Sequence, residues 1–347
     1  MKRTVVLGGS GFFGRAVAEL LRADGVAPLL ASRRAGADVV VDVENPASLR
    51  AALRPGDVLV DTVGPFQTRS PALVEAAIEI GCDLIDLSDS VRYTRDIHDR
   101  EPRIEARGIR VLTACSTLSV ISAAAIRRTG VEAPRRLTVA LAPASRRVAR
   151  PGTGGSLLAQ VGAPIEVFRE GRWTVATGFG EARGFQLPPP FGRVRGGLLE
   201  SVDAVSLPRI WPSLETVEFF LDPRAPGLNA VLSLAARSHA ARWLMRRLGR
   251  IGMACTRALG ASNGCVLLEV EGAGGTMRGC ALVATEKGYL TPAVPAALAA
   301  LAIAAGRFPH RGLVPADRQV EPEALWARLE ALGIRLVEAP CGRTPTP

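Results

Sequence analysis

A glycine-rich turn between an apolar strand and a helix constrains this chain more than any other feature. Residues 5–7 predict a short buried strand, and residues 15–22 carry apolar side chains at helical spacing. Dinucleotide-binding fingerprints have this order of strand, glycine turn and helix. Gly9 would allow the tight turn, Gly11 would leave room for a pyrophosphate, and Gly14 would let the helix approach the strand. The N–H groups and the dipole of the helix N-terminus would then favour a phosphate.

The glycines fit two spacings, 9/11/14 and 8/11/14. The second is common in short-chain dehydrogenases with an extended substrate domain, which transfer a proton through a Tyr-x-x-x-Lys pair. The two tyrosines, Tyr93 and Tyr289, are followed four residues later by Ile97 and Ala293, so that mechanism is excluded. A tight turn without a ligand is the alternative interpretation of the motif.

The length of the chain suggests two domains, and the distribution of its basic residues argues against a nucleic-acid partner. The chain has 347 residues, enough for two domains, and a formal net charge of +10. All but two of its 43 basic residues are arginine, and they are scattered through predicted helices. A nucleic-acid-binding surface would gather them with aromatic residues on one stripe, so we expect no such partner.

Cysteine and histidine usage predicts no metal site and a reducing compartment. The six cysteines include no CxxC pair, and the three histidines lie far apart. Free cysteines are typical of the cytoplasm, where we place the protein. The chain opens directly on strand-like sequence, so we expect no signal peptide. The longest apolar run, residues 293–305, contains Pro295 and is too short to cross a bilayer.

Residues 1–122 alternate predicted strands and helices. This alternation predicts an α/β fold with a Rossmann-type, doubly wound parallel sheet. Asn45 should cap the helix that begins at Pro46, and Ser88-Asp89-Ser90 should cap a later one. The predicted strands cover residues 5–7, 28–31, 38–43, 57–61, 82–87 and 109–113.

Residues 123–285 predict an inserted α+β domain for substrate binding and dimerisation. Longer strands alternate here with Gly/Pro-rich loops, and the last two form a hairpin across residues 272–275. The mainly antiparallel sheet would contain strands at 135–143, 165–177, 202–207, 216–221, 265–271 and 276–285, beside a basic helix at 229–248.

Residues 286–340 predict a C-terminal return to the first domain. A helix over residues 291–305 is apolar almost all round, so it must be buried on most sides. A helix at 321–332 and a strand at 334–337 follow, and the chain should fray from Cys341.

The end of the second strand distinguishes one nicotinamide cofactor from the other. An acidic residue about 20 positions beyond the glycines would bind the ribose 2′-OH of NAD, and none is present. Ser32, Arg33 and Arg34 instead supply a hydroxyl and two guanidiniums, which suit a 2′-phosphate. We therefore expect NADP(H) rather than NAD(H). Two solvated loop arginines are the alternative interpretation.

Two more segments follow predicted strands at the sheet edge where such folds bind ligands. Asp42 and Val43 end the third strand, and the Asp42 carboxylate could accept a hydrogen bond from the adenine amino group. A loop aspartate without a ligand is the alternative. The segment from Val63 to Phe66 follows the fourth strand and contains a Gly-Pro turn.

The basic stretch 237–250 permits two interpretations. A membrane surface could take up Trp243, Leu244 and Met245. We favour an ordinary amphipathic helix at a domain or dimer interface, and so expect no membrane partner.

Several segments together resemble the saccharopine dehydrogenase NADP-binding family. They are Gly8–Gly14, Ala31–Arg33, Asp57–Phe66, Gly81–Ser88 and, more loosely, the return at Lys287–Ala293. The resemblance implies NAD(P)-dependent redox chemistry, often at a C–N bond, a substrate domain inserted after the sixth strand, and a homodimer. By motif, it assigns the pyrophosphate to Gly9, Ser10, Gly11, Phe12, Phe13 and Gly14, the 2′-phosphate to Ser32 and Arg33, and the nicotinamide side to Gly64, Pro65 and Phe66.

The chain departs from the family pattern at both segments that should border the substrate. Asp89-Ser90 stands where the family usually has Gly-Glu, and Cys115–Leu118 stands where a Gly/Pro-rich turn is usual. The cofactor assignment survives these changes, whereas a saccharopine or polyamine substrate does not follow.

No catalytic group carries a signature of its own, although reduction of an imine or carbonyl needs a proton donor. Candidates near the strand ends, each of which can also be structural, are Asp86, Asp89, Tyr93, Cys115 and Ser116, and Arg183 or Arg193 could hold a substrate carboxylate. We expect an NADP(H)-dependent oxidoreductase that transfers a hydride to or from a small imine, carbonyl or amino-acid-like substrate. A non-catalytic NADPH-binding redox sensor and a peripheral membrane reductase with a lipid-like substrate are the alternatives.

Overall fold

The computed structural model describes residues 2–339, which form two compact units. Unit 1 contains the residues up to Ile121 together with Leu290–Leu325. Unit 2 contains Ser122–Tyr289 and the residues from Trp326 on. The expectation that the chain frays from Cys341 concerns residues outside the described range.

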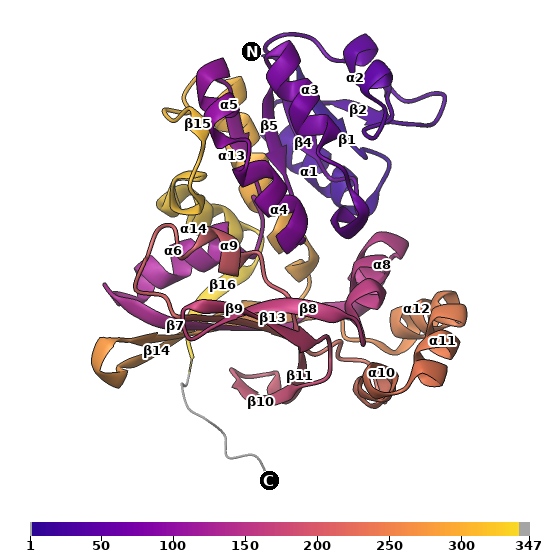
Figure 1. Cartoon of the computed structure of the whole chain (residues 1–347), viewed down its shortest axis with the longest axis vertical. Coiled ribbons are helices and arrows are strands. Elements are labelled where there is room, and N and C mark those ends of the chain that lie inside the picture. Colours follow the sequence, from indigo (N-terminus) through magenta and orange to yellow (C-terminus); the bar gives the residue numbers. More distant parts are fainter. Residues whose placement is uncertain (1, 340–347) are drawn as a thin grey trace. The chain divides into compact units, whose positions relative to one another are not determined.

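Unit 1 is built on a seven-stranded, all-parallel sheet (Figure 1). The strand order is β15-β6-β5-β4-β1-β2-β3, so the chain moves outward in both directions from β1. This order confirms the predicted doubly wound fold, whose ligand-binding edge lies at the carboxyl ends of the strands. The strands are β1 (Thr4–Leu7), β2 (Leu29–Ser32), β3 (Val39–Val40), β4 (Val58–Asp61), β5 (Asp83–Asp86), β6 (Arg110–Leu112) and β15 (Gly312–Leu313).

Helices cover this sheet and start at the caps expected from the sequence. Asn45 Oδ1 accepts hydrogen bonds from the N–H groups of Ala47 and Ser48, and Ser90 Oγ accepts one from Tyr93. The elements are α1 (Phe12–Ala23), α2 (Pro46–Ala52), α3 (Ala72–Ile80), α4 (Val91–His98), α5 (Glu101–Arg107), α13 (Val294–Ala304) and the 3₁₀ segments η1 (Phe66–Thr68), η3 (Gly288–Ala293) and η4 (Ala316–Arg318).

The apolar sequences of the central strands and of α13 follow from their burial. All residues of β1 and β4 are buried, as expected for parallel strands covered on both faces. The Ala/Leu-rich helix α13 packs against α1, β4 and β5, and eight of its residues are buried. A helix with so little polar surface is stable only in such a position.

Unit 2 is built on a nine-stranded mixed sheet. Its main path runs β10-β11-β12-β7-β13-β14-β16, and the hairpin β8–β9 adds to β12. The β7–β12 pair is parallel and the other pairs are antiparallel. The strands are β7 (Pro134–Ala142), β8 (Pro164–Arg169), β9 (Arg172–Thr177), β10 (Ala182–Leu187), β11 (Gly192–Leu199), β12 (Thr216–Leu221), β13 (Gly264–Gly272), β14 (Met277–Ala284) and β16 (Ile334–Glu338).

The remaining helical elements are mostly short. One of them, α8, is helical despite three glycines, and a Cβ atom at Gly154 would lie 2.5 Å from Met253 Sδ of α12. The elements are α6 (Val120–Thr129), α7 (Ser145–Val148), α8 (Pro151–Gln160), α9 (Asp203–Ser206), α10 (Leu228–Arg237), α11 (His239–Arg247), α12 (Gly249–Leu259), α14 (Pro322–Ala331) and the 3₁₀ segment η2 (Ala273–Gly275).

Three expectations for unit 2 need correction. The predicted strand 202–207 is the helix α9, because Ser201 Oγ accepts the N–H of the buried Asp203 and starts a helical turn. The predicted strand 165–177 is the hairpin β8–β9, which turns at two residues with positive φ, Glu170 and Gly171. The basic helix 229–248 is divided at Ser238, whose extended backbone ends α10 and whose hydroxyl caps α11.

The C-terminal return is also different from the expectation. Helix α13 and strand β15 join unit 1, as the apolar sequence suggests. The last strand does not, because β16 pairs with β14 and places Leu336 beside Leu282 in the second sheet. The open hydrogen-bonding edge of β14 is thereby covered.

Substituting Gly14 should destabilise the protein. A Cβ atom at this position would lie 2.2 Å from the Gly8 carbonyl oxygen, so Gly14→Ala should lower the free energy of unfolding by about 3 kcal/mol. Gly252→Ala is the matched control, because Gly252 also lies inside a helix but a Cβ atom there would meet nothing within 4 Å. It should raise stability by up to about 1 kcal/mol. Urea titration measures both, and equal effects would contradict the packing argument.

Candidate functional site

The glycine turn connects the ends of β1 and β2. The Ala31 carbonyl of β2 accepts hydrogen bonds from Gly8 N–H at 2.9 Å and Gly9 N–H at 3.1 Å. Gly11 N–H then donates to the Gly8 carbonyl at 2.7 Å, which closes the turn before α1. The turn is therefore fixed by backbone groups alone.

A different steric feature explains each glycine of the turn. The left-handed conformation falls on Gly8, with φ of 74°, rather than on Gly9 as the motif suggests. Gly9 is required because a Cβ atom there would lie 2.8 Å from Leu30 Cβ. At Gly11 a Cβ atom would meet only the Gly8 carbonyl oxygen, at 3.0 Å, among the described residues. The outer side of Gly11 is thus open to a ligand.

The N-terminus of α1 is suited to an anion. No side chain within the described residues caps the helix at Gly11, and its first turn contains no acidic residue. Ser10 and Gly11 are exposed, and Phe12 and Phe13 are half-buried with their ring centroids 5.2 Å apart. Unsatisfied N–H groups and the positive end of the helix dipole together attract phosphate.

The residues expected at the 2′-phosphate are the last residue of β2, Ser32, and the two that follow it. Ser32 Oγ accepts the N–H of Arg34 at 3.1 Å, which bends the chain after the strand. The side chains of Arg33 and Arg34 are exposed, and neither forms an ion pair within residues 2–339. Both guanidiniums are therefore available to an external anion.

The segment expected at the adenine is partly committed to its own loop. Asp42 Oδ1 accepts the Glu44 N–H at 3.0 Å, and the Asp42 N–H donates to Ser48 Oγ at 3.0 Å. Val43 is buried in the core of unit 1. The carboxylate of Asp42 thus already helps to shape the turn before α2.

A buried ion pair, which the sequence did not predict, supports the segment from Val63 to Phe66. Arg69 pairs with Asp61 at 3.1 Å and with Glu44 at 2.5 Å, and it is 5% exposed. Its Nη1 donates to the Val63 carbonyl at 2.6 Å, while Asp61 Oδ1 accepts the Val63 N–H at 2.9 Å. Burial raises the pKa of Asp61, and the Arg69 guanidinium opposes that rise.

Aromatic rings complete the environment of Arg69. Its guanidinium carbon lies 5.6 Å from the ring centre of Phe66 and 5.8 Å from that of Tyr93. The two rings are 5.3 Å apart. Charge, hydrogen bonds and rings therefore fix the backbone beyond β4.

Asp86 ends β5 beside Asp61, its neighbour in the parallel ladder. Its Oδ1 accepts two backbone N–H groups, those of Ser88 at 3.0 Å and Ala114 at 2.9 Å. Burial raises the pKa of Asp86 to about 6, and the N–H groups of Ala114 and Ser88 oppose that rise. Its Oδ2 is buried without a hydrogen-bond partner among the described residues.

The other candidate proton donors divide by exposure. Tyr93 and Cys115 are fully buried, and burial raises the pKa of both well above the ordinary value, so each holds its proton firmly. Ser116 and Asp89 are half-buried. Ser116 Oγ donates to the Pro292 carbonyl at 3.2 Å, and Asp89 accepts from Gln67 Nε2 at 3.1 Å. All five candidates lie in unit 1, at the end of β5 or in the segments that follow β5 and β6.

A comparison with known families covers most of the residues described above. Residues 4–112 match the family model of the saccharopine dehydrogenase NADP binding domain. Over these residues the chain is similar to that family, whose description names NADP binding. Cys115 and Ser116 lie beyond the matched range.

A curated relative resembles a short part of the chain, and a solved structure resembles nearly all of it. The trans-acting enoyl reductase of Mycobacterium leprae (strain TN) is 32% identical over 87 residues, or 24% of this chain, and the match spans only 20% of the relative's length. Apo saccharopine dehydrogenase (L-Glu forming) from Saccharomyces cerevisiae aligns with 98% of this chain and 99% of its own, at 17% identity and a TM-score of 0.63. The second likeness shows a shared fold.

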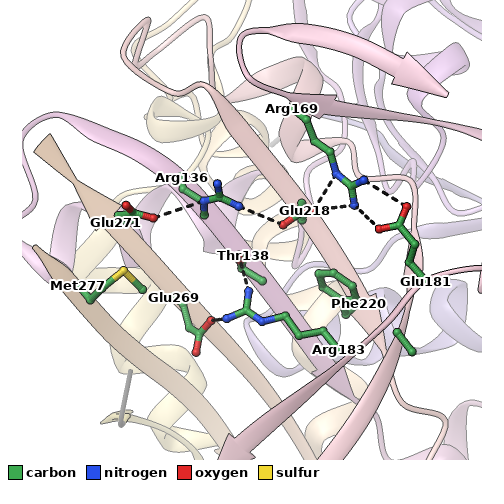
Figure 2. A pocket seen from close by; sticks show the side chains of 11 residues that line it. Arg136, Thr138, Arg169, Glu181, Arg183, Glu218, Phe220, Glu269, Glu271 and Met277 are labelled. Carbon is green, nitrogen blue, oxygen red and sulfur yellow. Dashed lines mark hydrogen bonds and ion pairs between the residues drawn. The ribbon is translucent and has the colours of Figure 1, made fainter. Parts of the chain in front are cut away.

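Outside the matched residues, unit 2 contains a pocket of about 670 Å³ on one face of its sheet (Figure 2). Arg183, one of the two arginines expected to hold a substrate carboxylate, lines it, whereas Arg193 is exposed on β11. Arg183 Nη2 lies 2.6 Å from Glu269 Oε2, and its Nη1 donates to Thr138 Oγ1 at 3.2 Å.

The charges of this pocket neutralise one another. Arg136 pairs with Glu218 and Glu271, and Arg169 pairs with Glu218 and Glu181 (Figure 2). Every arginine that lines the pocket is thus held by a glutamate. An incoming carboxylate would have to displace an internal one, so we assign this pocket no substrate.

The raised pKa of Asp86 should make stability depend on pH. The folded protein retains a proton up to about pH 6, whereas the unfolded chain releases it near pH 4. The folded state thus binds more protons in this window, and the free energy of unfolding should fall as pH rises from about 4 to about 6, by up to about 3 kcal/mol. Asp86→Asn should flatten this slope in urea titrations across that range. Parallel slopes for both proteins would contradict the assignment.

Proposed function

We propose that the protein is an NADP(H)-dependent oxidoreductase that transfers a hydride to or from a small substrate. The observation that carries the proposal is the combination of an open glycine turn at α1 with two arginines after β2, Arg33 and Arg34, that form no ion pair within residues 2–339. When bound, the nicotinamide supplies the hydride. The protein contributes binding, orientation and protons.

The residues present fit the cofactor. Gly11 and the N-terminus of α1 would receive the pyrophosphate, and Ser32, Arg33 and Arg34 would receive the 2′-phosphate. The segment from Val63 to Phe66 would lie on the nicotinamide side, where the Asp61–Arg69 pair keeps its backbone in place.

Asp86 acts in this proposal as a positioning residue. It holds the N–H groups of Ser88 and Ala114, and so ties together the two loops that should border the substrate. Ser116 and Asp89, which are half-buried, are the better candidates to exchange a proton with a substrate than the buried Tyr93 and Cys115.

The substrate class we propose is a small imine, carbonyl or amino-acid-like compound. The name of the mycobacterial relative adds a conjugated C=C bond as a second class, carried by 24% of the chain. A non-catalytic NADPH-binding sensor is the competing function, favoured by the burial of three of the five candidate proton donors.

A reductase and a sensor give different results with a substrate panel. Purified protein and NADPH are mixed in turn with keto acids, with imines and with enones, and absorbance at the reduced nicotinamide band is followed. Loss of absorbance with any class supports the reductase and identifies the class. Tight NADPH binding with unchanged absorbance throughout the panel would support the sensor instead.

The 2′-phosphate assignment has its own test. Arg33→Ala should weaken NADPH binding by about tenfold or more, because a charge-assisted phosphate contact is lost, and should change NADH binding by less than about twofold. Arg22→Ala is the matched control, since Arg22 is an exposed arginine in the last turn of α1, away from the glycine turn. Calorimetry measures all four affinities. An equal loss for NADPH and NADH would overturn the assignment.

A further inference from the structure

Three successive helices of unit 2, α10, α11 and α12, lie close together in Figure 1. They and the residue that joins α11 to α12 carry most of the exposed large hydrophobic side chains of unit 2. Their exposed fractions range from 44% to 66%, and α11 has no buried residue at all. The side chains are Val231, Leu234, Trp243, Leu244, Leu248, Ile251 and Leu259. Clusters of this kind mark interaction surfaces rather than ordinary solvent-facing helices.

These side chains come from two helices and from the residue that joins them. Leu244 lies in α11, Leu248 lies between α11 and α12, and Ile251 and Leu259 lie eight positions apart in α12, on one side of that helix. Trp243 precedes Leu244 in α11, and its ring centre is 5.7 Å from the guanidinium carbon of Arg247. Met245, which the sequence grouped with Trp243 and Leu244, is half-buried instead.

The charge of the same segment has a single sign. Between Asp222 and Glu269 the chain contains no acidic residue and seven arginines. Elsewhere in unit 2 arginines pair with glutamates, as in the pocket of Figure 2. Arg246 and Arg250 are exposed and form no ion pair within residues 2–339. The segment is therefore a cationic surface whose counter-charge is absent from the described chain.

Hydrogen bonds fix α11 to α10, and α12 to the residue that follows α7. Arg242 donates to the carbonyls of Ala235 and Ala236, at 3.3 and 3.2 Å, and so joins α11 to the end of α10. Arg257 of α12 donates to the Ala149 carbonyl at 3.2 Å. Hydrogen bonds thus hold in place the helices that carry the apolar and cationic side chains.

We propose that α10–α12 binds the surface of an anionic lipid bilayer. The apolar side chains around Trp243 would enter the head-group region, and the arginines would contact lipid phosphates. No helix within residues 2–339 is both long and apolar enough to cross a bilayer. The proposal rests on exposure and charge in unit 2 and is independent of the redox reaction.

A bilayer fits this surface better than a second copy of the chain or a nucleic acid. A two-fold symmetric contact would place arginine against arginine, because the segment has no acidic residue to receive them. Nucleic acid would satisfy the arginines but would leave Leu244, Leu248 and Ile251 exposed. An anionic bilayer receives both kinds of side chain.

Cosedimentation of the full chain with vesicles tests the proposal. The protein should pellet with phosphatidylcholine vesicles that contain phosphatidylglycerol, and not with phosphatidylcholine alone, and salt should weaken binding. Leu244→Ser combined with Leu248→Ser, and separately Arg246→Glu combined with Arg250→Glu, should each reduce the bound fraction about tenfold. NADPH binding and circular dichroism should stay unchanged in these variants.

Matched controls come from the hairpin β8–β9. Val175 is 75% exposed, more than any hydrophobic residue of the proposed surface, and the Arg172 side chain is 73% exposed. Val175→Ser and Arg172→Glu should leave vesicle binding within about twofold of the parent. Absence of sedimentation, or equal binding to both kinds of vesicle, would overturn the proposal. A dimer in sedimentation velocity that the Leu244/Leu248 variant dissociates, or RNA binding without vesicle binding, would do the same.

Discussion

The contact between Gly14 and the Gly8 carbonyl is the constraint on which the arrangement of unit 1 depends. It brings the backbone of α1 directly against the turn after β1, where a Cβ atom at Gly14 would lie 2.2 Å from that oxygen. The same turn uses the Ala31 carbonyl to hold β2. One close approach thus sets the helix N-terminus, the end of β1 and the end of β2 in a fixed relation. Those three elements are what a dinucleotide needs.

The sequence predicted the features that depend on neighbours along the chain. The strand, turn and helix at residues 5–22, the Asn45 and Ser90 caps and the hairpin β13–β14 all follow from local rules, and the structure has them. The Arg69 contacts could not be predicted, since Glu44 and Tyr93 lie more than twenty positions away in opposite directions. The pairing of β16 with β14 likewise depends on which sheet edge is open, which no local pattern records.

The net charge of +10 is distributed unevenly over the molecule. On the sheet face of unit 2, arginines and glutamates alternate and compensate each other, so composition there has little consequence for partners. Along α10–α12 the acids are missing, and the same composition leaves an uncompensated surface. The net charge of the whole chain therefore does not reveal the difference between the sheet face of unit 2 and α10–α12. The arginines are scattered along the chain, whereas the acidic residues are absent between Asp222 and Glu269.

The hydrogen bonds of Asp86 have a consequence for how this protein can vary. The carboxylate holds the loops after β5 and β6 through main-chain N–H groups of Ser88 and Ala114, and not through their side chains. The half-buried side chains of these loops, such as Asp89 and Ser116, can thus differ while these main-chain hydrogen bonds are kept. Proline is excluded at positions 88 and 114, because it has no N–H to donate. The groups that hold the two loops are thus distinct from the side chains that would face a reactant.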